Sequence, residues 1–439
     1  MNIVMVGAGY VGLVTSACFA KFGHRVFCVD TDQNKINQLR DGIMPIYEPG
    51  LEELVVKNVQ EGRLVFTTNL RACVPNGKAI FIAVGTPTSR RGDGFTDLQY
   101  VYTAARNIAK YLNAENYTVV INKSTVPIGT ARQVARRIKE VNKSANFDVV
   151  SNPEFLREGA AIKDFTHPDR VVIGVESEQA EMVLRDIYRP LSLQEAPILC
   201  TDIESAEMIK YASNAFLAVK ISFINEVANL CEQVEANVND VARGIGMDNR
   251  IGSKFLHPGP GYGGSCFPKD TKAFSTTARE FGLHLRIVES AIEVNDTQKV
   301  RMIKKIRDAI GGSEFGKVIA VLGLAFKPET DDMRDAAALT ILPVLLEKGA
   351  RVRTHDPQAM NEAKKFLPDS VVYCKNAYDA CVGADVVVIL TEWNQYRALD
   401  LNKISECMND NPVFIDLRNV YPPSQVRAFG FEYIGIGRK

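Results

Sequence analysis

Short apolar runs alternate with longer amphipathic segments along most of the chain. The first run, NIVMVG, leads into a helical stretch to about Phe22 that Gly23 ends, and the second run, HRVFCVD, closes at Asp30. Similar runs recur at 78–88, 118–129, 147–159 and 170–177. Uninterrupted apolar runs are typical of parallel strands buried on both faces, and their alternation with helices predicts a doubly wound parallel sheet.

The pattern changes after about residue 200. Residues 203–243 contain neither proline nor glycine, and apolar residues recur there at helical spacing. This spacing predicts a long helix with a break, which would connect two domains and offer a dimer surface. We expect further helices from about 271 to 310, and the alternation of strands and helices restarts at about 316.

Three glycines follow the first predicted strand directly, in the motif GAGYVG (Gly7, Gly9, Gly12), and Asp30 lies 18 residues after Gly12. A G-x-G-x-x-G turn lets a pyrophosphate approach the start of a helix, and an acid at this spacing accepts hydrogen bonds from a ribose diol. The acid favours NAD, because the 2′-phosphate of NADP would meet its negative charge. Lys35 would weaken that preference or be an ordinary surface lysine.

Residues 316–357 repeat the order strand, loop, helix, strand and acid, but their loop, GLAFKP, lacks the glycine motif. We therefore predict an α/β fold with two Rossmann-like doubly wound parallel-sheet domains joined by a long central helix. The expected domains are a cofactor domain (1–200), a helical dimerisation domain (201–315) and a second nucleotide-binding-type domain (316–439).

Charge and cysteine content narrow the class of protein. The 439 residues include 52 Lys and Arg against 52 Asp and Glu, which removes the electrostatic case for nucleic acid or an anionic membrane as partner. The nine cysteines and five histidines are scattered, with no C-x-x-C pair, so we expect neither a metal site nor a disulfide framework. Free thiols suit a reducing cytoplasm.

One cysteine stands apart from the others. Cys266 lies in GYGGSCFPKD among glycines and prolines, and Lys269 follows three residues later. A nearby cation or a helix N-terminus makes a thiol more nucleophilic. The alternative is a small buried thiol that packs a glycine-rich turn, which we expect for the other eight cysteines.

A dinucleotide motif together with a reactive thiol indicates a particular reaction. An alcohol dehydrogenation needs no thiol, but a thiol can hold an aldehyde as a thiohemiacetal, release a second hydride to give a thioester, and yield an acid on hydrolysis. With a second nucleotide-type domain, the sequence predicts four-electron oxidation of an alcohol on a nucleotide-carrying substrate. The carboxyl ends of the predicted strands, where such sites form, carry Thr86, Thr125, Glu154 and Glu158.

Seven motifs, in order along nearly the whole chain, resemble the UDP-glucose/GDP-mannose dehydrogenase family. They are MVGAGYVGL, VGTPT, KSTVPIGT, NPEFLREG, IKYASNAFLAVKISFINEVA, PGPGYGGSCFPKD and FKPETDDMR. The resemblance implies oxidation of the 6-hydroxymethyl group of UDP-glucose to UDP-glucuronate with two NAD, in a homodimer formed by the long helix.

The resemblance also implies roles for individual residues. Cys266 would be the nucleophile, Lys210 and Asn214 would stabilise the oxyanion, Glu154 would assist proton transfer, and Thr125 and Asp270 would position water. The implied cofactor residues are Gly7, Gly9, Tyr10, Val11, Gly12, Asp30, Lys35, Thr86, Thr125, Glu158, Lys269 and Arg334. The implied substrate residues are Glu154, Phe155, Leu156, Arg157, Glu158, Lys210, Asn214, Arg250, Phe255, Leu256, His257, Pro258, Gly259, Gly263 and Lys327.

Three alternatives stay open from the sequence. His257 stands where the family pattern has a small polar residue, which leaves the preferred nucleotide sugar open. A sibling enzyme for GDP-mannose or a UDP-N-acetylhexosamine would use the same chemistry. A two-electron 3-hydroxyacid dehydrogenase would use Cys266 only structurally. A non-catalytic nucleotide-binding module would leave Cys266, Lys269 and Asp270 without a purpose.

Overall fold

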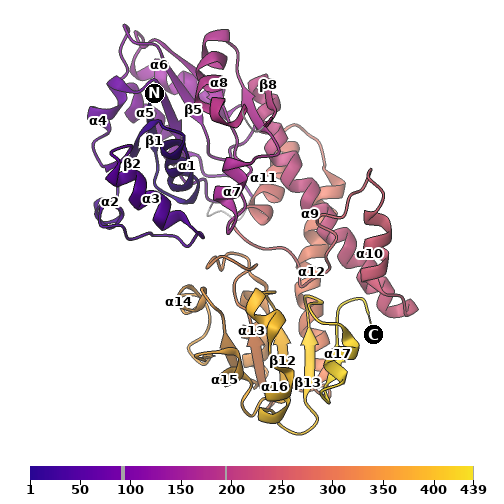
Figure 1. Cartoon of the computed structure of the whole chain (residues 1–439). Coiled ribbons are helices and arrows are strands. Elements are labelled where there is room, and N and C mark those ends of the chain that lie inside the picture. The colour runs from indigo at the N-terminus through magenta and orange to yellow at the C-terminus, as the bar shows by residue number, and fades with distance from the viewer. Residues whose placement is uncertain (90–93, 193–194, 439) are drawn as a thin grey trace. The chain divides into compact units, whose positions relative to one another are not determined.

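The computed structural model describes residues 1–89, 94–192 and 195–438. The chain divides into two compact units, drawn in Figure 1. The first comprises Met1–Ser213 with Arg279–Phe281, and the second comprises Asn214–Ala278 with Gly282–Lys439. Each unit contains one sheet.

The first unit is built on an eight-stranded sheet in the order β3-β2-β1-β4-β5-β6-β7-β8. Its strands are β1 (Asn2–Val6), β2 (Arg25–Val29), β3 (Leu64–Thr67), β4 (Ala79–Ile82), β5 (Thr118–Asn122), β6 (Phe147–Ser151), β7 (Val171–Gly174) and β8 (Ile198–Thr201). The order reverses between β1 and β4. In doubly wound sheets, ligands bind beyond the carboxyl ends of the strands at such a reversal.

Helices cover both faces of this sheet, as alternate residues of each strand require. Ile3 and Met5 of β1 belong to one core, and Val4 belongs to the other, together with Ile80 and Ile82 of β4. The first core is closed by α1 (Tyr10–Lys21), α2 (Gln33–Arg40), α3 (Leu51–Gln60), α7 (Ala161–Thr166) and α8 (Glu178–Ser192), and the second by α4 (Leu70–Cys73), α5 (Gln99–Ala109) and α6 (Thr130–Val141).

One pair of neighbouring strands departs from the predicted parallel sheet. Ser151 of β6 pairs with Gly174 of β7 in the antiparallel sense. The connection between them contains only α7, six residues long. The pairing means that the chain enters β7 from the carboxyl end of β6 and does not first cross back to the opposite edge of the sheet.

The predicted long helix is present, and so is its break. The helical elements of this region are α9 (Ile203–Val234), α10 (Val238–Gly246), α11 (Phe267–Glu280) and α12 (Arg286–Ala309). Glu235, which follows α9, has a positive φ of 62° that a continuing helix does not allow. The start of α11 differs from the expected one, because the helix begins at Phe267 and not at about 271.

The second unit contains a six-stranded parallel sheet in the order β11-β10-β9-β12-β13-β14. Its elements are β9 (Val318–Leu322), α13 (Ala337–Glu347), β10 (Arg351–His355), α14 (Met360–Ala363), β11 (Val372–Tyr373), α15 (Ala377–Cys381), β12 (Val386–Ile389), α16 (Leu401–Cys407), β13 (Val413–Asp416), α17 (Pro423–Arg427) and β14 (Glu432–Ile434). Its order reverses between β9 and β12, as between β1 and β4.

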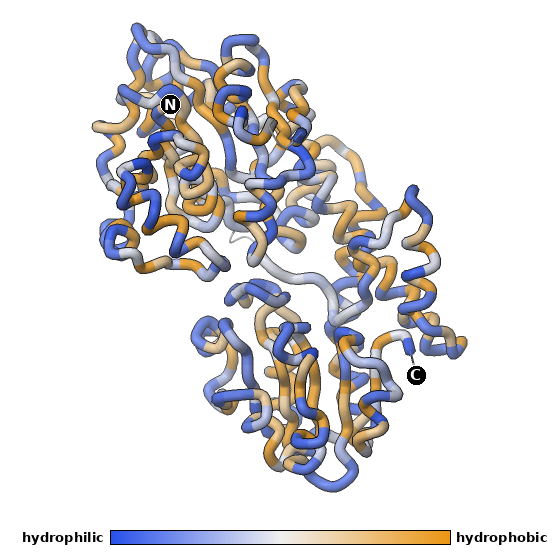
Figure 2. The backbone as a smooth tube through the Cα atoms, in the orientation of Figure 1, coloured by the Kyte–Doolittle hydropathy of each residue, from blue (hydrophilic) through white to orange (hydrophobic). Residues whose placement is uncertain are grey.

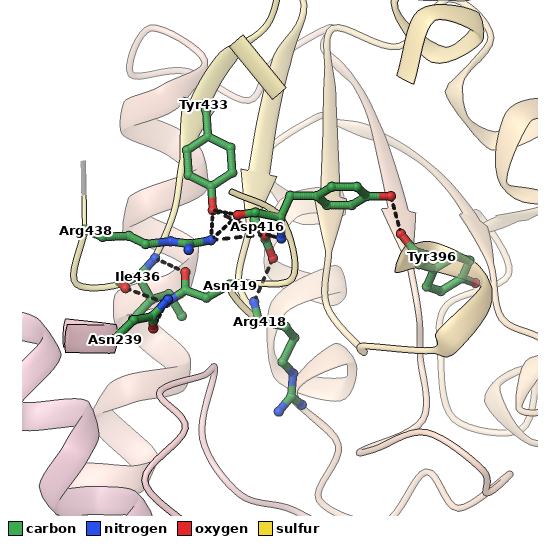
Figure 3. Close-up of polar contacts among 9 residues, drawn as sticks. Asn239, Tyr396, Asp416, Arg418, Asn419, Tyr433, Ile436 and Arg438 are labelled. Carbon is green, nitrogen blue, oxygen red and sulfur yellow. Dashed lines mark hydrogen bonds and ion pairs between the residues drawn. The ribbon is translucent and has the colours of Figure 1, made fainter. Parts of the chain in front are cut away.

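A polar network holds the C-terminal residues of the chain against the end of β13 in this second sheet (Figure 3). The fully buried carboxylate of Asp416 accepts hydrogen bonds from the Tyr421 backbone N–H and the Tyr433 hydroxyl, at 2.9 Å and 3.2 Å. Arg438 lies on the same carboxylate, 3.6 Å away. Figure 3 also shows the guanidinium of Arg418 directed away from this network, although its backbone N–H donates to Asp416.

Across the described ranges, no helix is both long and apolar enough to cross a membrane.

Candidate active site

The glycine motif forms the turn between β1 and α1, as the sequence predicts. Gly7 has a φ of 109°, and a Cβ atom there would meet the carbonyl oxygen of Ala83 at 2.5 Å. At Gly9, which precedes α1, a Cβ atom would meet nothing within 4 Å. The open space in front of free helix N–H groups suits the pyrophosphate of a dinucleotide. Gly12 and the half-buried Val11 continue into α1.

Asp30 lies directly after β2, and its carboxylate accepts three hydrogen bonds. Its Oδ2 accepts from the Ala8 N–H at 2.8 Å and from Lys35 Nζ at 3.2 Å, and its Oδ1 accepts from the Asp32 N–H at 3.0 Å. Burial raises the pKa of Asp30, but the hydrogen bonds from Asp32 and Ala8 and the charge of Lys35 outweigh it, so the pKa lies below its usual value. The ionised carboxylate fits a ribose diol.

Tyr10 of the glycine motif donates its hydroxyl to Glu48. The same buried carboxylate accepts from the backbone N–H groups of Gly159 and Ala161, at 2.6 Å and 2.8 Å. Glu48 thereby joins the dinucleotide turn to the loop that carries Glu158, whose charge contributes to a raised Tyr10 pKa that burial mainly causes. Sequence reasoning missed Glu48, because its partners lie 38 and 111 positions away.

Thr86 and Thr125 follow β4 and β5, so both lie at the carboxyl edge of the sheet, where we expected them. Both are half-buried. The turn after Thr125 is held by Glu207, which accepts from the Gly129 N–H at 2.6 Å and from the Ala131 N–H at 3.0 Å. Burial raises the pKa of Glu207 to about 7, although these backbone bonds oppose the shift.

Glu154 and Lys210 form a buried ion pair. The distance from Lys210 Nζ to Glu154 Oε1 is 3.1 Å, and the two side chains are 4% and 5% exposed. Glu154 Oε2 also accepts from the Leu156 N–H at 2.6 Å. A buried pair of this kind is costly to form and is as compatible with a structural role as with a functional one. Its place beyond β6 favours the functional role.

The rest of the 154–158 loop divides into two parts. The Phe155 ring lies below the guanidinium of Arg170, at 3.7 Å, and within 5.3 Å of Lys210 Nζ. The exposed guanidinium of Arg157 is paired with Asp164 of α7 at 2.6 Å, so its side chain braces the loop. Substrate contacts predicted for Arg157 would therefore come from its backbone.

Cys266 stands immediately before α11 and is half-buried. Its carbonyl accepts the first helical hydrogen bond, from the Asp270 N–H at 2.8 Å. The thiol therefore lies at a helix N-terminus, where partial positive charge favours a thiolate. The Ser265 hydroxyl is 3.4 Å from its Sγ. The expected cation, Lys269, lies against a different group.

That group is the carboxylate of Asp270, which is 1% exposed. Its Oδ1 accepts from Lys269 Nζ at 2.6 Å, and its Oδ2 accepts from Asn214 Nδ2 at 2.6 Å. The structure thus brings together three of the predicted site residues one helical turn after Cys266. Asn214 lies four residues after Lys210 on α9, which places the two side chains on one face of that helix.

Buried amide side chains hold the loop that leads to Cys266. Asn295 of α12 accepts from the Tyr262 N–H at 2.7 Å and donates to the Tyr262 carbonyl at 3.1 Å. Gly259 is held in the same way by Asn225 of α9 and Gln298 of α12, at 2.9 Å and 3.0 Å. A Cβ atom at Gly263 would collide with the carbonyl of Asp335. These hydrogen bonds hold the backbone of the loop in a single conformation.

The predicted substrate residues before this loop border a cavity of about 360 Å³ in the second unit. Leu256, His257 and Pro258 line it together with Arg418, which sequence reasoning missed. Arg418 donates to the carbonyls of Leu390 and Phe326 at 2.8 Å and 3.1 Å. It is the cationic side chain closest to Gly259, with an Nη1 that a Cβ atom there would meet at 3.2 Å.

Four further predicted residues lie in the second unit, at separate places. Phe255 has a φ of 66°, a strained value for an aromatic residue. Arg250 is paired with Asp248 at 2.6 Å, and its side chain is 89% exposed. Lys327 follows β9 and lies 5.4 Å from the Phe326 ring. Arg334 is paired with Asp332 at 2.8 Å, and its carbonyl accepts from the Gly264 N–H.

Among the described residues, no group of three or more His, Cys, Asp or Glu side chains could hold a metal ion.

Comparison with known proteins adds the decisive observation. Residues 1–192 match the NAD binding domain of the UDP-glucose/GDP-mannose dehydrogenase family, residues 204–297 match its central domain, and residues 320–423 match its UDP binding domain. The chain belongs to this family. The predicted α/β class and the predicted cofactor, NAD, are thereby confirmed.

Two relatives within the family are similar over the full length. A UDP-glucose 6-dehydrogenase of Rhizobium meliloti (strain 1021) is 54% identical and covers 100% of both chains. The solved structure of a UDP-glucose dehydrogenase from Pyrobaculum islandicum has a TM-score of 0.92 and 40% identity, and the match covers 100% of this chain and 98% of that one.

A third relative has a different sugar in its name. The UDP-D-ManNAc dehydrogenase of Pyrococcus horikoshii has a TM-score of 0.86 and 28% identity, with 100% of this chain and 99% of that one covered. Within the family, this chain is therefore more similar to the proteins named for UDP-glucose.

Proposed function

We propose that this protein oxidises the 6-hydroxymethyl group of UDP-glucose to a carboxylate, giving UDP-glucuronate, with NAD as the acceptor in both oxidations. The observation that carries the proposal is the placement of Cys266 at the start of α11, one turn before an Asp270 carboxylate held by Asn214 and Lys269. A two-electron dehydrogenase has no use for a thiol placed in this way.

Gly7, Gly9 and Asp30 would hold NAD in the first unit, where it would supply the hydride acceptor for C6 in each oxidation. In the first oxidation, the C6 hydroxyl loses its proton to water, and the Lys210 ammonium stabilises the C6 oxygen as it gains negative charge. The resulting aldehyde carbon is attacked by Cys266 Sγ. A carbon–sulfur bond forms, the carbonyl oxygen takes a proton, and a thiohemiacetal results. Asn214 supplies a second donor for that oxygen from the same face of α9.

Loss of the second hydride converts the thiohemiacetal into a thioester on Cys266. Water then attacks the carbonyl carbon, the carbon–sulfur bond breaks, and the thiol is restored. Asp270 and Thr125 position the water, and Glu154 accepts its proton. For each alcohol and one water, two NAD⁺ become two NADH, and the carboxylate and three protons are released.

The choice of UDP-glucose over sibling substrates rests on similarity, because the diphosphate is common to all of these nucleotide sugars. The relative named for UDP-glucose is 54% identical, against 28% for the one named for an N-acetylated sugar. Lys327, at the carboxyl end of β9, would face the diphosphate and stand in for the missing glycine motif. His257 is the departure that most concerns sugar preference, and its exposed side chain borders the 360 Å³ cavity.

The covalent step can be tested by trapping it. Glu154→Gln removes the group that accepts the proton of water, so hydrolysis slows and the thioester should accumulate when the variant is mixed with UDP-glucose and NAD. Intact-mass measurement after an acid quench should show a gain equal to a UDP-glucuronyl group, on the peptide that contains Cys266. The double variant Glu154→Gln/Cys266→Ser is the control and should gain no mass. An adduct on another residue would overturn the proposal.

We also propose that the protein is a homodimer assembled through α9. Phe216, Phe223 and Leu230 follow one another at seven-residue spacing, which places them along one side of a helix. They are 64%, 51% and 62% exposed. Figure 2 shows apolar stretches recurring along α9. A stripe of large apolar side chains left in water is characteristic of a subunit interface.

Light scattering tests the dimer. The native protein should have twice the 48.5 kDa mass of the chain, and Phe223→Glu/Leu230→Glu should be a monomer at the same concentration, because the interface would bury two charges per chain. Met182 of α8 is 69% exposed, so Met182→Glu is the matched control and should stay dimeric. A native protein of 48.5 kDa would contradict this proposal.

Two further expectations stay proposals. All nine cysteines are free thiols in the structure, which supports a reducing, cytoplasmic setting. The three-part division into 1–200, 201–315 and 316–439 is also retained as a prediction.

A further inference from the structure

Lys123 is a buried lysine whose ammonium has only uncharged partners. Its Nζ donates to Asn152 Oδ1 at 3.1 Å and to the Tyr188 hydroxyl at 3.2 Å, and the residue is 4% exposed. Within the described ranges it forms no ion pair. Burying an ammonium without a carboxylate partner is costly.

The position of Lys123 connects it to the loop that carries Glu154. Lys123 follows β5, and its partner Asn152 follows β6, two residues before Glu154. Asn152 is completely buried and is held on three sides. Its backbone N–H donates to the Asn122 carbonyl at 2.9 Å, its Nδ2 donates to the Val172 carbonyl at 2.7 Å, and its Oδ1 accepts from Tyr188 at 2.6 Å. Lys123 completes this set and so fixes where the loop begins.

Lys123 also shares its surroundings with the Lys210–Glu154 pair. Burial lowers the pKa of Lys123 to about 7, the charge of Glu154 opposes this shift, and the charge of Lys210 adds to it. The ammonium donates to the Tyr188 hydroxyl of α8, and the charged groups whose fields reach it are Glu154 of the β6 loop and Lys210 of α9. Glu154 therefore interacts with the charges of both Lys123 and Lys210, and the two lysines repel each other when both are protonated.

We propose that Lys123 is a positioning residue for the Lys210–Glu154 pair, which it serves by fixing the Asn152 segment and by contributing a positive charge to the surroundings of Glu154. The proposal rests on the proposed function, in which Glu154 must be ionised to accept a proton. A positive neighbour favours the ionised form of a carboxylate, and removing that neighbour disfavours it.

The test compares Lys123→Met with Lys123→Arg in steady-state assays from pH 5 to 10 with UDP-glucose and NAD. Lys123→Met should lower kcat by about tenfold to hundredfold, since the loop carrying Glu154 loses one anchor. It should also move the acidic limb of the kcat profile upward by about half a pH unit or more. KM should change little. Lys123→Arg, which keeps the charge, should restore the acidic limb. An unmoved acidic limb in Lys123→Met would overturn the proposal.

Stability separates this role from a structural one. Because Lys123→Met removes an unpaired buried charge, its melting temperature should equal or exceed that of the native protein. A lower melting temperature together with a normal pH profile would assign Lys123 to the fold alone. If Lys123→Met does not fold, Lys123→Gln, which keeps a donor for Asn152, is assayed in the same way.

Lys78 provides the matched control, because it precedes β4 at the opposite edge of the same sheet and donates to the Tyr117 carbonyl at 3.4 Å. Lys78→Met should leave the profile unchanged. NADH released per UDP-glucose is counted for the native protein in the same series. One NADH would contradict the proposed function whatever the Lys123 variants do, and two NADH with an unmoved acidic limb would contradict only the role of Lys123.

Discussion

Replacing Cys266 by serine should reduce UDP-glucuronate formation on the order of 10⁴-fold or more, the scale seen when a nucleophile is removed from an enzyme that depends on it. A serine hydroxyl at the start of α11 keeps the shape of the site, but it ionises far less readily than a thiol and forms no thioester. The product is measured by chromatography after prolonged incubation with excess NAD.

The control for this variant is another half-buried cysteine. Cys200 of β8 has an arginine nearby, with Arg185 Nη2 3.2 Å from its Sγ. Proximity to a cation alone would make it a rival to Cys266, yet it does not lie at a helix start. Cys200→Ser should retain native activity, and both variants should retain the native melting temperature. Near-native acid formation by Cys266→Ser would refute the covalent scheme.

Replacing Lys210 by methionine should have the second largest effect. The variant loses a donor to the developing oxyanion, which lowers kcat by about 10²- to 10³-fold. It also leaves Glu154 buried without its partner 3.1 Å away, and breaking a buried ion pair in this way costs about 3–5 kcal/mol of folding free energy. Both the activity and the melting temperature of the variant are therefore expected to fall.

A double variant separates these two losses. Lys210→Met/Glu154→Gln removes the uncompensated charge, because a neutral amide replaces the buried carboxylate. The double variant should regain most of the folding free energy that Lys210→Met loses, while its activity should remain as low as that of Lys210→Met. If Lys210→Met keeps more than about a tenth of the native kcat, the oxyanion role fails, and the pair is structural.

The local signals in the sequence predicted most of the first sheet and the cofactor turn. Gly7, Gly9 and Asp30 lie where their spacing placed them, because a strand, a tight turn and a helix are determined by neighbouring residues. The break after α9 is of the same kind. The short edge strands β3, β8, β11 and β14 were not predicted, since their runs are too brief to stand out from the loops around them.

The start of α11 shows a different limit. The run of glycine and proline before Asp270 indicated a loop, and the structure instead begins a helix at Phe267 with Pro268 as its second residue. Proline is favoured in the first turn of a helix, where its missing N–H costs nothing. The sequence contained this signal, and it would have placed Cys266 at a helix start.

Three buried polar groups outside the seven motifs' implied roles could not be predicted. Lys123, Glu48 and Glu207 owe their burial and their partners to contacts with residues far away in the sequence. A lysine directly after an apolar strand is a weak hint, because most lysines in that place reach water. Only the assembled sheet shows that Lys123 is enclosed by β6 and α8.

The most direct test of the central claim is the number of NADH molecules released for each UDP-glucose consumed. The native protein is given limiting UDP-glucose and excess NAD, NADH is followed at its absorbance maximum, and the remaining sugar nucleotide is quantified by chromatography. Oxidation through a thioester on Cys266 predicts two NADH for each UDP-glucose and UDP-glucuronate as the product. One NADH for each UDP-glucose, with an aldehyde as the final product, would contradict it.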